Sequence, residues 1–274
     1  MSLRLFATAV LVSLAPLPCW AANPVPMAAH QALYELTLDK ATSDDLAGAQ
    51  GTMAYDVADA CDGWATRQRL DLTLTNRDGQ DIHMVSDYTT WESKDGLSMR
   101  FRMKQLTDGA VTDQAEGEAK LDGVGGAGTI HYTVPEERDM AMPKGTLFPM
   151  KHTETILNGA SEGKKFMSLP IFDGTGTKGT QDSSVVVLGW GPPVAGAGGA
   201  PYPALEGLAS GRVHIAFFDR TAADAAATKP AGSPDYEVSM TYWANGVADG
   251  LHMQFADFLM NGRLREFALQ APHC

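Results

Sequence analysis

The sequence predicts a mainly β fold, a large antiparallel meander with one short helix near its middle. Three observations support this fold. Apolar and polar residues alternate along most of the chain, Asp-Gly and Asn-Gly pairs separate the alternating runs, and one segment near residue 150 has helical spacing instead. The chain has 274 residues, 44% of them apolar, with 28 glycines and 15 prolines, which argues against a membrane bundle or a coiled coil.

Two-residue alternation predicts half-buried strands. Tyr34, Leu36 and Leu38 fall on one face of such a strand, with polar residues between them. The runs that share this pattern are Tyr34–Asp39, Met53–Val57, Arg69–Leu74 and Leu97–Lys104. In the last two runs Arg69, Arg100 and Arg102 fall opposite the apolar positions, so we expect them to point outward.

Residue pairs that tolerate positive φ occur where hairpins need them. These pairs are Asp78-Gly79, Asp95-Gly96, Asp108-Gly109, Asp122-Gly123, Asn245-Gly246 and Asn261-Gly262. We therefore predict tight turns at all six places. Longer loops are predicted at the Gly/Pro-rich stretch Gly189–Pro203 and the Ala-rich stretch Thr221–Pro234.

The helix is predicted from about Phe148 to Asn158. Pro149 suits its first turn, apolar residues recur at helical spacing from Met150 to Leu157, and Asn158-Gly159 is a stop signal. This break could separate two domains, but more than half of the possible contacts in a curled sheet would cross it. We therefore expect a single domain with two lobes, in which the helix lies where the two halves meet.

The N-terminus has the features of a secretory signal peptide. Arg4 supplies a positive charge, Leu5–Leu17 is apolar, and Cys19-Trp20-Ala21-Ala22 ends in small residues. We predict a signal peptide over residues 1–22 and a mature domain over 23–274. No later segment reaches roughly 18 uninterrupted apolar residues, so no transmembrane helix is expected in the mature chain.

Removal of the signal leaves two cysteines, Cys61 and Cys274, in an oxidising compartment. The even count predicts a disulfide between them, and two separate thiols are the alternative. The formal net charge of −12 repels phosphate backbones, which excludes nucleic acid as a partner.

Several motif matches fail their structural requirements. Gly123–Gly128 and Gly174–Gly179 fit the dinucleotide-binding expression, but strand-like residues follow both, so neither offers a helix N-terminus to a pyrophosphate. Gly159–Gly163 spells G-x-S-x-G around Ser161, yet it follows a helix end instead of preceding a helix.

We expect no catalytic residue, no metal site and no cofactor, because the seven histidines form no ligand cluster either. His152 is the best single candidate for a special role, against the commoner outcome of a hydrogen-bonded helical histidine.

A resemblance to a known protein family extends over nearly the whole mature chain. The segments that carry it are His30–Leu36, Gly51–Tyr55, Cys61–Trp64, Tyr88–Glu92, Pro143–Pro149, His152-Thr153, Phe172–Gly174, Asn245–Val247 and the terminal Cys274. In order and spacing they resemble the envelope integrity protein B (EipB) family of Gram-negative periplasmic proteins. The resemblance implies a spiral-like open β-barrel of two intertwined halves and one disulfide, which maps onto Cys61 and Cys274.

The resemblance also implies a periplasmic, non-enzymatic binding or scaffolding role in cell-envelope integrity. The partner it implies is an unidentified periplasmic protein, a tetratricopeptide-repeat envelope protein being one candidate, or a lipid or peptide. We expect a monomer. The candidate ligand or partner surface is placed on the concave face near the helix, and its residues are Trp91, Phe148, His152 and Trp243.

Two other classes of function stay open. The first is a carrier of an apolar envelope ligand such as a lipid, because methionines on the predicted strands could line a barrel lumen. These methionines are Met84, Met99, Met103, Met240, Met253 and Met260. The second and more remote class is a hydrolase whose catalytic residues are dispersed in the sequence.

Overall fold

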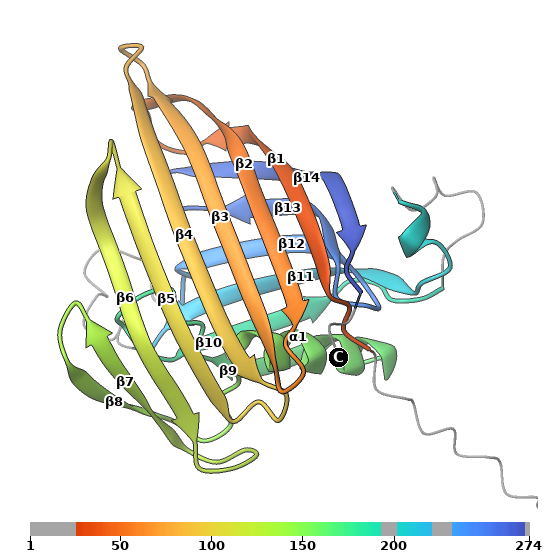
Figure 1. Cartoon of the computed structure of the whole chain (residues 1–274). Coiled ribbons are helices and arrows are strands. Elements are labelled where there is room, and N and C mark those ends of the chain that lie inside the picture. Colours follow the sequence, from red (N-terminus) through yellow and green to blue (C-terminus); the bar gives the residue numbers. More distant parts are fainter. Residues whose placement is uncertain (1–25, 193–201, 221–231, 272–274) are drawn as a thin grey trace, which may run out of the picture.

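The fold is one large antiparallel sheet that curls on itself, and the one α-helix of the described residues lies across one end of it (Figure 1). The computed structural model describes residues 26–192, 202–220 and 232–271. The strands of the first half are β1 (His30–Ala41), β2 (Leu46–Asp59), β3 (Gly63–Asn76), β4 (Asp81–Ser93), β5 (Ser98–Thr107), β6 (Ala110–Leu121), β7 (Gly128–Val134) and β8 (Arg138–Met142). Helix α1 (Pro149–Ser161) follows, and the second half contains β9 (Phe166–Ile171), β10 (Gln181–Val187), the short 3-10 helix η1 (Pro203–Leu205), β11 (Ser210–Asp219), β12 (Tyr236–Trp243), β13 (Ala248–Gln254) and β14 (Phe258–Leu269).

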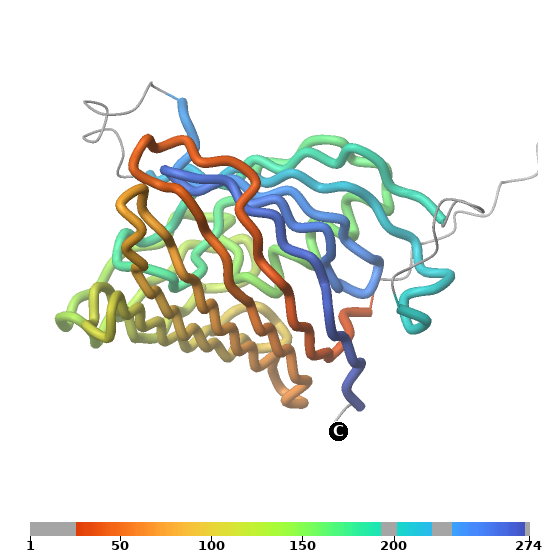
Figure 2. The backbone as a smooth tube through the Cα atoms, turned by 90° about the horizontal axis from the view of Figure 1, so that it is seen from above, coloured from red at the N-terminus to blue at the C-terminus, as the bar shows by residue number. Residues whose placement is uncertain are grey.

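The two halves of the chain meet through their first and last strands. Strands β1 to β8 pair in sequence order, strands β9 to β14 do the same, and β14 pairs with β1, so the sheet has 14 strands with β8 and β9 at its edges. Figure 2 shows β1 and β14 running side by side. The predicted antiparallel meander, curled but not closed, is confirmed.

The segment between β8 and β9 crosses the open seam. Leu147, just before α1, forms a parallel bridge with Ile171 at the end of β9. The residues after β9 turn inward onto the first half, where Phe172 meets the rings of Phe101 and Tyr132 edge-on at 5.1 and 6.3 Å between centroids. This aromatic cluster holds the seam from inside.

Helix α1 starts one residue after the predicted start and ends three residues after the predicted end, so the expectation that Asn158-Gly159 stops it is wrong. Gly159 continues the helix because it is buried there against Met167, and an added Cβ would come within 2.5 Å of the Met167 sulfur. The chain turns instead at Gly163, whose φ of 82° is the left-handed conformation that commonly ends a helix.

Five of the six predicted turns are confirmed, and the sixth is wrong. Asn261-Gly262 lies inside β14, where Gly262 pairs with Leu36 on one side and Leu251 on the other. A Cβ at Gly262 would lie 3.0 Å from the Leu251 Cβ and 3.1 Å from a Leu36 methyl carbon. The glycine is there because its two neighbours approach closely, and not because a hairpin needs positive φ.

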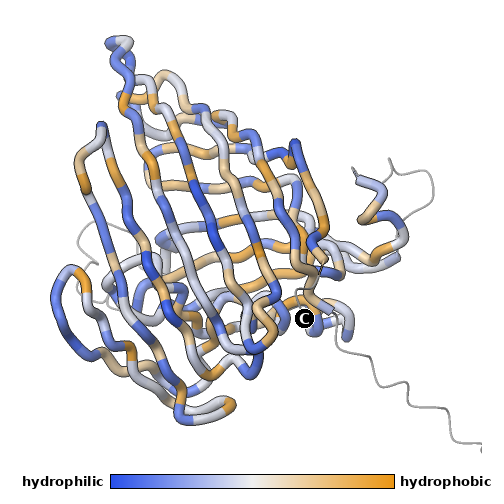
Figure 3. The backbone as a smooth tube through the Cα atoms, in the orientation of Figure 1, coloured by the Kyte–Doolittle hydropathy of each residue, from blue (hydrophilic) through white to orange (hydrophobic). Residues whose placement is uncertain are grey.

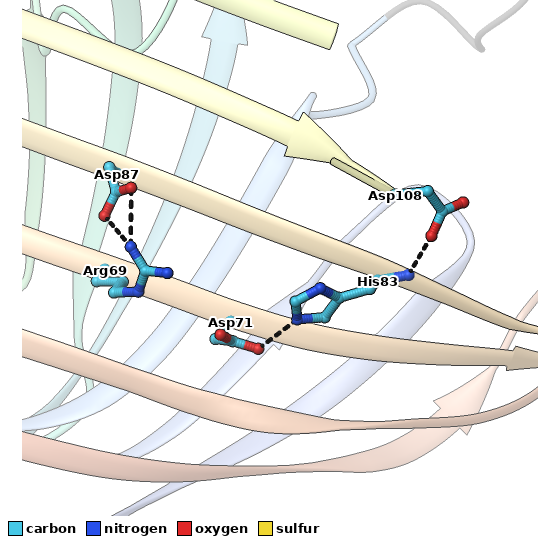
Figure 4. A network of polar contacts seen from close by, with 5 residues as sticks. All are labelled: Arg69, Asp71, His83, Asp87 and Asp108. Atoms are coloured by element: carbon cyan, nitrogen blue, oxygen red, sulfur yellow. Dashed lines mark hydrogen bonds and ion pairs between the residues drawn. The ribbon is translucent and has the colours of Figure 1, made fainter. Parts of the chain in front are cut away.

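Polar and apolar residues alternate along the strands, as the sequence predicts (Figure 3). On the outer face of β3 and β4, Arg69 makes a two-pronged ion pair with Asp87 at 2.8 and 2.9 Å, and His83 contacts Asp71 at 2.8 Å (Figure 4). Arg100 and Arg102 are exposed on β5. The expectation that these three arginines point outward is confirmed.

The predicted signal peptide and Cys274 lie outside the described residues, as do parts of both predicted long loops. The described ends of β2 and β14, the strands that precede the two cysteines, lie at the same end of the sheet. Val57 of β2 and Leu269 of β14 both pair with His30, from opposite sides, and both strands leave the sheet in the same direction. Cys61 lies in the turn after β2, and Gln270 reaches Asp56 at 3.1 Å across the same end.

We therefore expect Cys61 and Cys274 to form a disulfide in the exported protein. Alkylation followed by mass measurement under non-reducing conditions checks this, and two alkylated thiols would contradict it. Cys274→Ser should lower the free energy of unfolding by at most roughly 5 kcal/mol, the chain-entropy value for a loop of this length, and by less where the pairing of β14 already restrains the terminus.

Candidate ligand-binding cavity

A cavity of about 530 Å³ lies between the inner face of β1 to β6 and the inner face of β11 to β13. Helix α1 lies across one end of the barrel (Figure 1) and contributes Met150 and Thr153 to the lining. The loop before β10 contributes Asp173 and Thr175. The cavity is therefore enclosed by both halves of the sheet and by the segment that crosses the seam.

Strand alternation explains which side chains reach the cavity. Tyr34 pairs with Met53, and Met53 pairs with Leu70, so all three share the inner face of β1, β2 and β3. The apolar wall contains Met53, Leu70, Met103, Met240, Met253 and Phe255. Flexible thioethers adapt to ligands of varied shape, which makes such a wall permissive for apolar chains.

Five tyrosines also line the cavity: Tyr34, Tyr55, Tyr88, Tyr236 and Tyr242. Burial raises the pKa of each of these phenols, so all are neutral at physiological pH. The Tyr34 hydroxyl donates to the Ala248 carbonyl at 2.8 Å, and the Tyr88 hydroxyl donates to the Asp173 carbonyl. These two bonds tie the first half of the sheet to the second half and to the loop before β10.

The N-terminus of α1 is held by a carboxylate from the opposite half. No side chain of the helix caps it, and instead Glu92 of β4 accepts the backbone N–H groups of Met150 and Lys151 at 2.7 and 2.9 Å. Glu92 is only 2% exposed. Such a bond satisfies helix donors that would otherwise be buried without partners, and it places a negative charge at the positive end of the helix dipole.

Burial raises the pKa of Glu92 to about 7, while the two backbone donors and Lys151 oppose the rise. Lys151 itself contacts Glu154 at 2.9 Å, which adds a second carboxylate near the site. The carboxyl that anchors the helix therefore titrates near neutral pH.

His152 and Ser183 lie at the distance of a catalytic pair, with the His152 Nε2 and the Ser183 Oγ 2.7 Å apart. The Ser183 hydroxyl, however, donates its proton to the Leu169 carbonyl at 2.6 Å, so it accepts from the histidine. Both residues are buried, and burial lowers the pKa of His152 to about 4. The pair therefore fastens α1 to β10 and β9.

None of the four residues predicted to form the ligand or partner surface lines the cavity. Phe148 is fully buried as the residue before α1, His152 is buried against Ser183, and Trp243 is buried at the end of β12. Trp91 lies on the outer face of β4 beneath Arg100, whose guanidinium carbon is 4.6 Å from the ring centroid. Contact of these residues with a partner stays a prediction.

The methionines proposed for a lumen divide into two sets. Met103, Met240 and Met253 line the cavity, whereas Met84, Met99 and Met260 do not. Met99 and Met260 are buried in the core instead. The alternation of each strand predicts which methionines face inward, but the position of the cavity along the barrel depends on strand pairing between distant segments.

The glycine-rich motifs lie in turns or at a helix end. Gly123–Gly128 connects β6 to β7, Gly174–Gly179 connects β9 to β10, and Ser161 is exposed at the end of α1. Within residues 26–192, 202–220 and 232–271, no group of His, Cys, Asp and Glu side chains could hold a metal ion. No helix in this part of the chain is both long and apolar enough to cross a bilayer.

Comparison with known proteins agrees with this architecture. A model of the EipB-like family matches residues 21–271. The cell envelope integrity protein EipB of Brucella abortus (strain 2308) is 30% identical over 255 residues, which cover 89% of this chain and 85% of that protein. The chain belongs to the EipB-like family. A crystal structure of a beta-barrel-like protein of a domain of unknown function, also from Brucella abortus, is similar to this EipB-like chain with a TM-score of 0.77 and 25% identity, over 90% of this chain and 100% of that one.

We expect the stability of the protein to fall as pH rises through the titration of Glu92. The ordinary pKa of the carboxyl, 4.5, applies to the unfolded chain, and the folded pKa is about 7. Between these values the folded protein binds the proton more tightly, so the free energy of unfolding decreases with pH, by up to roughly 3 kcal/mol in total.

Urea unfolding between pH 5 and pH 8 checks this when wild type is compared with Glu92→Gln. Other titrating groups, such as His152, are common to both proteins, so the difference between the two curves isolates Glu92. Glu118→Gln, on the exposed face of β6, serves as the matched control and should keep the wild-type pH dependence. If Glu92→Gln kept the wild-type pH dependence of the free energy of unfolding, Glu92 would not be the group that titrates near neutral pH.

Proposed function

We propose that this EipB-like protein is a periplasmic, non-enzymatic binding protein that supports cell-envelope integrity by holding an apolar envelope component, such as a lipid chain, in its interior. The observation that carries the proposal is the cavity of about 530 Å³ with a methionine- and aromatic-rich wall. Its volume falls in the range of small-molecule sites, and apolar lining with a few polar groups is typical of them.

The envelope role is supported by the relative from Brucella abortus, which is named a cell envelope integrity protein. The periplasmic location is supported by the predicted signal peptide over residues 1–22. An apolar component of the envelope is a ligand that such a protein would meet in that compartment.

Two serine–histidine pairs occur among the described residues. His214 and Ser239, 2.9 Å apart, do not line the cavity, and the His152–Ser183 pair lacks the geometry for catalysis. Nucleophilic attack needs the serine proton to point to the histidine and the hydroxyl to be accessible. Ser183 meets neither requirement, because its proton is donated to Leu169 and its side chain is buried.

A protein partner is the second candidate, and the sheet edges favour it. Among the described strands, β8 and β9 each pair on one side only, and Phe166 at the start of β9 is 77% exposed. An open edge can accept a strand from another chain. A photo-crosslinking residue at Phe166, used in intact cells, would identify such a partner, including a tetratricopeptide-repeat envelope protein. The same crosslinking residue at Ser184, an exposed position on β10, is the control. A crosslinking yield at Phe166 no higher than at Ser184 would contradict binding of a partner at this edge.

We expect Met53→Trp to fill part of the cavity and weaken binding of a fluorescent apolar probe at least about tenfold. Met53 lines the cavity, so the larger ring occupies space that the ligand needs. Thr52→Trp is the matched control, because Thr52 is the preceding residue of β2 and faces solvent. Probe titration should show a loss only for Met53→Trp, with both variants folded by circular dichroism. Equal binding by both variants would contradict the proposal.

Ser161→Ala and Ser183→Ala should each restore envelope integrity to cells that lack the protein, as well as wild type does at equal protein level. Within the part of the chain that the structure describes, the Ser161 side chain makes only a local bond, to the Asn158 carbonyl at 2.8 Å. Ser183→Ala should cost about 1 to 3 kcal/mol of stability, because the buried His152 ring loses its partner. Loss of function at a normal protein level in either variant would instead support a hydrolase.

A further inference from the structure

One row of cross-strand neighbours on the inner face changes from apolar to polar. The pairing runs from Tyr34 to Met53 and Leu70, and then to Ser86, Gln105 and Asp113, on β1 to β6 in order. All six residues line the cavity. Because neighbouring strands are about 5 Å apart, the apolar and polar halves of the row are each about 10 Å long.

The three polar side chains of the row make almost no contacts that stabilise the fold. Within the described residues, the side chains of Ser86 and Gln105 make no hydrogen bond, and the Asp113 carboxylate contacts only the backbone of Gln114 next to it. The Ser86 and Gln105 side chains are both half-buried and line the cavity, so their polar atoms are available to a ligand. Asp113 is exposed at the far end of the row, so the polar half leads toward solvent.

The charge of this end of the cavity is negative. Asp173 contributes a second carboxyl group, which accepts from the Thr175 backbone at 2.9 Å and from its hydroxyl at 2.8 Å, and burial raises its pKa. No lysine or arginine is among the residues that line the cavity. An anionic group would therefore lie near the Asp113 carboxylate without a lysine or arginine in the lining to offset the repulsion, which is unfavourable in a partly desolvated site.

The volume limits the size of the ligand. A cavity of about 530 Å³ falls within the size range of small-molecule sites. This size fits one alkyl chain with a small polar end better than a lipid with two long chains.

We infer that the cavity takes a single-chain amphiphile whose polar end donates hydrogen bonds and carries no negative charge, with that end at Ser86, Gln105 and Asp113. The inference rests on the proposed function and specifies its ligand class. The alkyl chain lies along Met53 and Leu70 toward the second half of the sheet, and a neutral or cationic headgroup meets the two carboxyl groups.

The test uses the full mature protein and four probes below their micelle concentrations: a long-chain alkyl amine, the monoacylglycerol and the fatty acid of the same chain length, and a short diacyl phosphatidylcholine. Displacement of a fluorescent apolar probe gives their relative affinities. We expect the amine and the monoacylglycerol to bind at least about tenfold more tightly than the fatty acid and the diacyl lipid.

Two variants place the polar end. Asp113→Asn should reduce the ratio of the amine affinity to the fatty-acid affinity at least about threefold. Gln105→Leu should weaken binding of the monoacylglycerol by a similar factor. The matched controls are Glu118→Gln and Gln114→Leu, which are exposed positions on β6. Neither control should change the ranking.

A fatty acid that binds as tightly as the amine, or a diacyl lipid that binds as tightly as the monoacylglycerol, would overturn the inference while leaving the proposed function intact. The same holds if Asp113→Asn leaves the ranking unchanged. Failure of wild type to bind the fluorescent probe itself would overturn the proposed function, and the inference with it.

Discussion

The pairing of β1 with β14 is the constraint on which the rest of the structure depends. Eight strands of the first half and six of the second each form a meander, and among the described strands the only ladder that joins the two meanders is the one between His30–Ala41 and Phe258–Leu269. Once that ladder forms, the two halves curl toward each other and their opposite edges, β8 and β9, are left at a seam. The cavity lies between the two halves because the β1–β14 ladder joins them and because they curl toward each other.

The crossing segment converts this open seam into a covered one. Glu92 of the first half holds the start of α1, His152 in the first turn of α1 contacts Ser183 of the second half, and Phe172, just after β9, packs among aromatic rings of the first half. Each contact joins segments far apart in the sequence. Because Glu92 is a buried carboxyl whose pKa is about 7, this anchor of α1 is sensitive to pH near neutrality.

Patterns of neighbouring residues predict much of this fold, and the features that they fail to predict depend on contacts between distant parts of the chain. Alternation identifies the inner face of each strand, and Asp-Gly pairs identify most hairpins, because both depend on adjacent residues alone. Asn261-Gly262 has the sequence of a turn, but close packing against Leu36 and Leu251 places it within a strand. The cavity could not be located for the same reason, since the row from Tyr34 to Asp113 exists only once six strands are in register. Glu92 gives no local sign that it caps a helix that begins near residue 150.

Native mass spectrometry of the protein released from its own cells without detergent tests most directly whether the interior holds one alkyl chain. We expect one bound single-chain lipid per protein chain, released on denaturation and lost when Met53 is replaced by Trp. A protein that carries no bound lipid under these conditions, and that takes up none when incubated with an extract of its own envelope, would contradict the account.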